Sequence, residues 1–88
     1  MNTSTEATKK LQESLKSVKE AKNIIDNLIA PHDYQDVASL VAQASAAMLE
    51  AANHFMQKQD EEALAKIEEA DDLVEAVYDI IDGDLDEA

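Results

Sequence analysis

The chain has 88 residues, a formal net charge of -13 and no cysteine, with one glycine and one proline. This length allows a single small domain over 1–88, and the lack of cysteine excludes disulfide bonds and thiolate metal sites. So few turn-forming residues, beside abundant Ala, Leu, Glu and Lys, predict an all-helical protein. Because no apolar run is long enough for a signal peptide or a membrane span, we expect a cytoplasmic protein.

The first predicted helix covers about 4–30. Thr3 and Glu6 have the spacing of a capping box, which starts a helix, and Pro31 stops it by disfavouring helical geometry in the preceding residue. Lys22 lies within the apolar side, so its charged head must either extend past the core or pair with an acid across a helix interface. The apolar residues that recur every three or four positions are Ala7, Leu11, Leu15, Val18, Ile25, Leu28 and Ile29.

The second predicted helix covers about 34–58, with Asp33 as its N-terminal cap. Its apolar positions alternate by three and four residues, and many neighbouring positions are small, which allows close helix packing. This apolar side consists of Tyr34, Val37, Val41, Ala44, Met48, Ala51 and Phe55. The pattern indicates an amphipathic helix with one side in the core.

The third predicted helix covers about 61–82, capped by Asp60 and ended by Gly83, which leaves an acidic tail over 83–88. Its apolar side consists of Ala63, Ile67, Ala70, Val74, Val77 and Ile81. Three helices joined by short connections predict an antiparallel three-helix bundle with up-down-up topology.

Nearly all the excess negative charge follows Pro31, where sixteen acidic residues accompany only Lys58 and Lys66. On the third helix, a turn of about 100° per residue places five carboxylates on one side, opposite the apolar positions: Glu61, Glu68, Asp72, Glu75 and Asp79. Two interpretations stay open. The row is either a solvated surface, or it binds the basic surface of a partner protein, as an inhibitor that mimics DNA would.

The same charge argues against direct binding of nucleic acid or of an anionic membrane, because the chain contains no arginine and few aromatic residues. The third helix also has a wider apolar side than a three-helix core needs, since Leu73 and Ile80 extend it on one flank and Leu64 and Tyr78 on the other. That width predicts a homodimer interface at Leu73 and Ile80, or a structural subunit of a helical oligomer.

Metal and catalytic signatures are weak. Asp82, Asp84 and Asp86 alternate as in a calcium loop, but the glycine and the terminal glutamate of an EF-hand are missing. Glu50 and His54 are four residues apart on the polar side of the second helix, where a surface ion pair or hydrogen bond is expected. With no glycine-rich phosphate loop and no nucleophile–histidine pair, we predict no catalytic residues, no metal and no cofactor.

Residues 34–82 resemble the helical hairpin of PhoU-type phosphate regulators, in which apolar positions alternate with acids after a short turn. The resemblance implies a regulatory, partner-binding protein, and the chain would be a fragment of that family's usual bundle. The family's metal-binding Glu-x-x-x-Asp spacing is present at Glu68 and Glu75, but its arginine-containing flank is absent, so no metal role is carried over. The residues that carry the resemblance are Phe55, Asp60, Ile67, Asp71, Val74, Glu75 and Tyr78.

Overall fold

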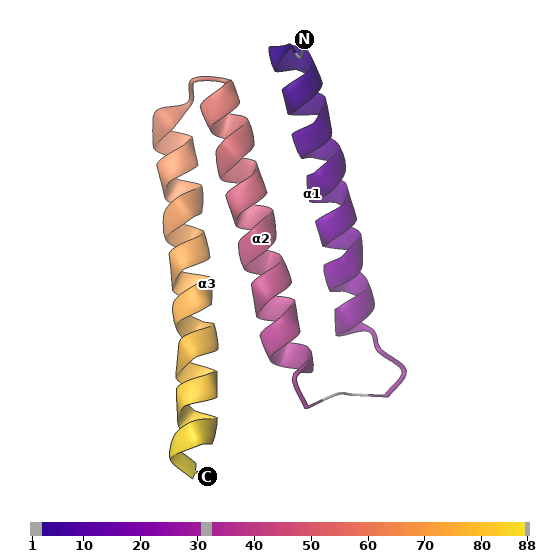
Figure 1. Ribbon diagram of the computed structural model, residues 1–88, viewed down its shortest axis with the longest axis vertical. Helices are drawn as coiled ribbons and strands as arrows, with labels where there is room; N and C mark the ends of the chain where they lie inside the picture. Colours follow the sequence, from indigo (N-terminus) through magenta and orange to yellow (C-terminus); the bar gives the residue numbers. More distant parts are fainter. Residues whose placement is uncertain (1–2, 31–32, 88) are drawn as a thin grey trace.

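A computed structural model describes residues 3–30 and 33–87. It contains three helices, α1 (Ser4–Asp26), α2 (Gln35–Met56) and α3 (Asp60–Glu87), which run in alternating directions (Figure 1). The described ranges contain no strand. The predicted all-α antiparallel three-helix bundle is therefore confirmed. No helix in these ranges combines the length and the apolar character needed to cross a membrane.

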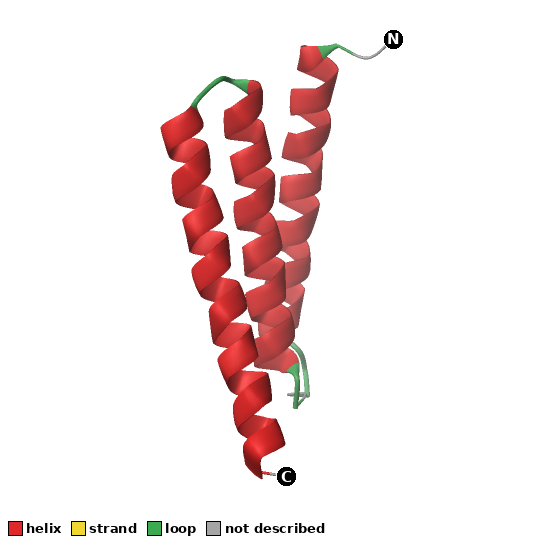
Figure 2. Ribbon diagram, turned by 60° about the vertical axis from the view of Figure 1, so that its left-hand side comes forward, coloured by secondary structure: helices red, strands yellow, loops and turns green. Residues whose placement is uncertain are grey.

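The helix α2 lies in the middle of the bundle and packs against both neighbours (Figures 1 and 2). In the described part of the chain, no Cα atom of α1 comes within 8 Å of a Cα atom of α3. The molecule measures 50 × 29 × 20 Å, and its radius of gyration is 15.4 Å, against about 12 Å for a compact domain of this length. The bundle is therefore an open layer, not a closed cylinder.

The open arrangement leaves much surface in contact with solvent. The accessible surface is 6506 Å², whereas a compact monomer of 9.6 kDa is expected to expose about 5,100 Å². Among the described residues, every buried side chain is an alanine: Ala44, Ala46, Ala47, Ala51, Ala63 and Ala70. Because α3 packs only on α2, Ala63 and Ala70 mark the side of α3 that faces α2. Small side chains at this contact let the two helices approach closely.

The helix starts agree only in part with the predicted caps. The backbone N–H of Glu6 donates to Thr3 Oγ1 at 3.2 Å, so Thr3 caps α1 as predicted. The predicted cap at Asp33 is wrong, because α2 begins two residues later and its N-cap position is Tyr34. Asp60 is likewise already the first residue of α3. Its carboxylate still lies in the first turn, where the helix dipole favours negative charge.

The first helix ends at Asp26, earlier than the predicted residue 30. The side-chain amide of Asn27 donates to the backbone carbonyl of Asn23 at 2.7 Å and to Asn23 Oδ1 at 3.1 Å. Such local side-chain bonds compete with helical backbone bonds, whereas apolar periodicity alone extends the helix through Leu28 and Ile29. The predicted continuation is therefore wrong.

The connection between α2 and α3 is a tight, hydrogen-bonded reversal. The N–H of Gln59 donates to the carbonyl of His54 at 2.9 Å, and the N–H of Lys58 donates to the carbonyl of Phe55 at 3.0 Å. These two bonds form a Schellman motif. Lys58 has φ 59, the left-handed conformation that glycine normally adopts at this position.

The third helix continues through Gly83 to Glu87, so the predicted acidic tail over 83–88 is helical as far as it is described. Gly83 does not have a positive φ. A glycine costs a helix about 1 kcal/mol relative to alanine, a cost that helical neighbours on both sides can offset. Ala88 lies outside the described residues.

Candidate protein-binding surface

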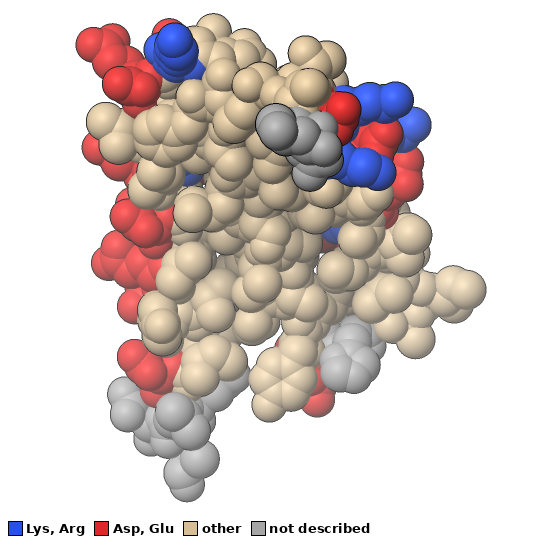
Figure 3. Space-filling model, turned by 45° about the horizontal axis from the view of Figure 1, so that its top comes forward, with Lys and Arg blue, Asp and Glu red and all other residues tan. Residues whose placement is uncertain are grey.

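The predicted carboxylates form one continuous row on the outer edge of α3. Ala63 and Ala70 pack against α2, and the carboxylates lie about half a turn away from them around the helix. Figure 3 shows acidic side chains gathered along this edge. The structure thus brings together the five predicted residues, all exposed, which we call the carboxylate row: Glu61, Glu68, Asp72, Glu75 and Asp79.

Among the residues that the structure describes, no lysine forms an ion pair with the carboxylate row. The ion pairs of the described residues join Lys10 to Glu13, Lys19 and Lys66 to Glu50, Lys22 to Asp26, and Lys66 to Glu69. Five of the seven lysines lie on α1, and α2 separates α1 from α3. The negative charge of the row is therefore open to solvent and to any approaching partner.

The linear charge density of α3 is close to that of a nucleic-acid strand. Ten carboxylates lie between Asp60 and Asp82, a helical length of about 33 Å at a rise of 1.5 Å per residue. This is about one charge every 3.3 Å, against about 3.4 Å for one strand of duplex DNA. The comparison includes every carboxylate around this part of the helix, and five of the ten form the outward row.

Glu50 connects all three helices on one face of the layer. Lys66 Nζ lies 2.8 Å from Glu50 Oε2, and Lys19 Nζ lies 3.8 Å from Glu50 Oε1. The hydrogen bond to Glu50, and then that to Glu69, raises the pKa of Lys66. His54 instead contacts Gln59, with 2.6 Å between Nδ1 and Oε1. Glu50 and His54 thus have separate partners, as expected for an ion pair and a hydrogen bond.

The histidine and acidic side chains that could bind a metal ion also lie apart from one another. Within the described ranges, no three histidine or acidic residues converge in a way that could hold an ion. The first residue of each Glu-x-x-x-Asp spacing, Glu68 and Glu75, lies on the exposed outer edge. Five carboxylates of α3 therefore follow a line, and among the described residues no three of its carboxylates are grouped so that they could hold an ion.

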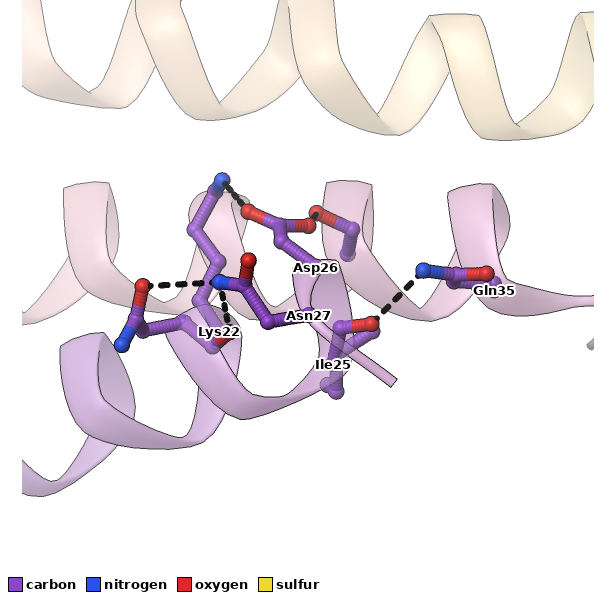
Figure 4. A network of polar contacts seen from close by, with 7 residues as sticks. Lys22, Ile25, Asp26, Asn27 and Gln35 are labelled. Carbon is purple, nitrogen blue, oxygen red and sulfur yellow. Dashed lines mark hydrogen bonds and ion pairs between the residues drawn. The ribbon is translucent and has the colours of Figure 1, made fainter. Parts of the chain in front are cut away.

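The end of α1 is joined to α2 by a polar network (Figure 4). Lys22 Nζ lies 2.6 Å from Asp26 Oδ2, and the Ser39 hydroxyl donates to Asp26 Oδ1 at 2.5 Å. The Gln35 amide donates to the Ile25 carbonyl at 2.8 Å. The bond from Lys22, and then that from Ser39, lowers the pKa of Asp26. Lys22 therefore pairs within its own helix, which neither predicted alternative described.

An apolar groove between α2 and α3 was not predicted from the sequence. It encloses about 800 Å³, and several large side chains on its walls are about half exposed. We call it the α2–α3 groove; its walls are Val41, Ala44, Ser45, Met48 and Leu49 of α2, and Ala70, Asp71, Val74, Val77 and Tyr78 of α3. A signal was present in the sequence, because Val41 and Met48 are seven residues apart, as in the seam of a helix pair.

The predicted dimer residues lie outside this groove. Leu73 is half-buried beside Gln43 and Asp72, in a shallow hollow that shares no residue with the groove. Ile80 is exposed. A homodimer through Leu73 and Ile80 therefore stays a prediction, and the larger exposed apolar area is at the groove.

Comparison with known proteins found no matching family model, no matching curated protein and no matching solved structure. The resemblance of residues 34–82 to PhoU-type regulators therefore stays a prediction.

Proposed function

We propose that this protein is a non-enzymatic binding protein whose carboxylate row docks on the basic surface of a partner protein, as an inhibitor that mimics DNA. The supporting observation is that five exposed carboxylates follow one edge of α3 without a lysine partner among the described residues. A partner that holds DNA phosphates with lysine and arginine side chains offers the matching charge. We propose a cytoplasmic location for this role.

The arrangement of the row works against the folding of α3. Glu68 and Asp72, like Glu75 and Asp79, are like charges four residues apart, and each such pair opposes a helix by about 0.2 to 0.5 kcal/mol. Solubility alone would be served equally well by acids distributed over all three helices. The cost therefore supports a binding role for the row, while a solvated surface is the alternative that an experiment must exclude.

The decisive experiment compares two variants with the same net charge. In the row variant, four carboxylates become amides: Glu68→Gln, Asp72→Asn, Glu75→Gln and Asp79→Asn. In the control variant, four exposed carboxylates on α1 or in the connection between α1 and α2 become amides: Glu6→Gln, Glu13→Gln, Glu20→Gln and Asp33→Asn. Each protein is immobilised and exposed to a lysate of the source organism, and the retained proteins are identified by mass spectrometry.

We expect the native and control proteins to retain the same partners, and the row variant to lose them. Duplex DNA added as a competitor should release these partners, and so should a rise in salt from about 50 mM to about 200 mM, because each screened contact weakens binding. If the row variant retains the same proteins as the control, or if salt and duplex DNA release nothing, the row is only a solvated surface.

A further inference from the structure

A line of large apolar side chains runs along α2 and is only partly covered by the neighbouring helices. Val41, Met48 and Phe55 are seven residues apart and are 50, 50 and 45% exposed. They span about 21 Å of the helix. Seven-residue spacing keeps apolar residues on one seam, and such a seam normally packs against another helix. The packing of α1 and α3 on α2 leaves about half of each of these side chains exposed.

The helix α3 carries a second line with the same spacing. Leu64, Asp71 and Tyr78 are seven residues apart, and the two apolar members are 54 and 64% exposed. Asp71 and Tyr78 belong to one wall of the α2–α3 groove, and Val41 and Met48 belong to the other. These two facing seams with heptad spacing give the α2–α3 groove a shape that suits a helix. Figure 3 shows uncharged side chains over the middle of the molecule, beside the acidic edge of α3.

The open layer leaves more surface exposed than a compact fold would. The chain exposes about 1,400 Å² more than a compact monomer of its mass is expected to expose. A standard protein interface takes about 800 Å² from each partner. A helix that covered the groove and the two seams would bury part of this excess, including the half-exposed apolar side chains of both seams.

The charges of the groove indicate which helix fits it. Asp71 lies in the middle of the α3 seam, and no ion pair among the described residues neutralises it. Glu68 and Glu75 lie nearby, one turn before and after it on the outer side of α3. The groove residues contributed by α2 carry no charge. One rim is thus acidic, so the occupant must carry positive charge toward α3.

A second copy of this chain fits these charges poorly, because it would bring another net charge of -13 against an acidic rim. Its most basic helix, α1, is already held against its own α2 by the bonds at Asp26 and Gln35. We propose that the α2–α3 groove binds an amphipathic helix of a partner protein whose apolar side is flanked by lysine or arginine. This inference goes beyond the proposed function, since the carboxylate row can bind a basic surface whether or not the groove is occupied.

Two synthetic peptides of identical composition test the proposal. Both contain leucine, alanine and arginine in equal numbers; in one the leucines follow a heptad pattern with flanking arginines, and in the other the same residues are distributed around the helix. Binding is measured by fluorescence anisotropy at about 0.15 M salt, where distant charges are screened. We expect the amphipathic peptide to bind at least about tenfold more tightly, because only it presents a continuous apolar side.

Paired protein variants locate the binding site. Met48→Lys places a positive charge in the groove, whereas Ile24→Lys makes the same change at an exposed apolar position on α1. We expect Met48→Lys to weaken peptide binding about tenfold or more, as loss of a central contact does, and Ile24→Lys to leave it within about twofold. Tyr78→Ala, which adds no charge to this exposed position, should also weaken binding. Asp71→Asn should weaken it more than Asp79→Asn, although the net charge changes equally.

Equal binding of the two peptides, or equal loss with Met48→Lys and Ile24→Lys, would overturn the proposal. So would a sedimentation mass of two chains together with failure to bind the amphipathic peptide, because the occupant would then be a second copy. The tests of the two proposals fail independently. The row variant also removes the rim charges of Glu68 and Glu75, so Met48→Lys, which keeps every carboxylate of the row, separates the two proposals. Loss of lysate partners by the row variant, together with equal binding of the two peptides, supports the row alone. Weaker peptide binding by Met48→Lys, with lysate partners kept by the row variant, supports the groove alone.

Discussion

Neutralising the carboxylate row should make the free protein more stable. The row variant defined above removes three like-charge pairs four residues apart on α3, which are Glu68 with Asp72, Asp71 with Glu75, and Glu75 with Asp79. Each such pair opposes a helix by about 0.2 to 0.5 kcal/mol, so their removal should raise the free energy of unfolding by about 1 kcal/mol. In a domain of this size, that gain raises Tm by about 4 to 8 °C.

Thermal unfolding followed by circular dichroism measures this gain directly. It should be largest at low salt and should shrink at about 1 M salt, where the Debye length is about 3 Å. The control variant should not gain stability, because Glu13 lies 3.3 Å from Lys10 and Glu6 occupies the first turn of α1, where the helix dipole favours an acid. Its Tm should stay level or decrease.

The outcome would decide why the row exists. A stabilised row variant that also loses its partners would show that these carboxylates serve binding at the expense of folding, a common relation at functional sites. If the row variant has an unchanged or lower Tm at low salt, or if its gain persists at high salt, then the carboxylates do not repel one another as the spacing implies. The electrostatic reasoning would then be refuted.

Three further predictions concern the fold. Lys58→Gly should raise the free energy of unfolding by about 1 kcal/mol in chemical denaturation, because Lys58 has φ 59, while Lys58→Ala, still strained, should gain less. Ala63→Leu should lower that free energy by about 1 to 3 kcal/mol, since Ala63 is fully buried against α2, whereas Ala65→Leu at an exposed position should change little. The pKa of Asp26 is lowered from 3.8 in the folded state. The ionised carboxylate therefore stabilises the fold at pH values above the pKa of the unfolded chain, and this stabilisation should be lost as pH falls through the lower pKa of the folded protein. An NMR titration of Asp26 should show the lowered pKa, and Lys22→Met should raise it.

Much of this structure follows from local properties of the chain. Apolar residues at three-and-four spacing predicted all three helices, and the Thr3 cap formed as expected because it needs only a neighbouring backbone N–H. The carboxylate row also follows from the sequence, since helical geometry alone places residues such as Glu68 and Asp72 on one side. The early end of α1 was not predicted, because the Asn27 side chain donates to the backbone carbonyl of Asn23 one turn earlier. Apolar periodicity carries no information about such side-chain bonds, which compete with the helical backbone bonds.

The tertiary structure decided which helix sides are covered. Periodicity determines the angle of each side chain about its own helix axis, but it does not say which neighbour packs there. Val41 and Met48 were predicted to be core residues, yet they are half exposed because α1 packs on another side of α2 and stays apart from α3. In the same way, Glu50 meets Lys19 and Lys66 only because α2 lies between the other two helices. The row is thus a property of one helix, whereas the α2–α3 groove exists because three helices pack as an open layer.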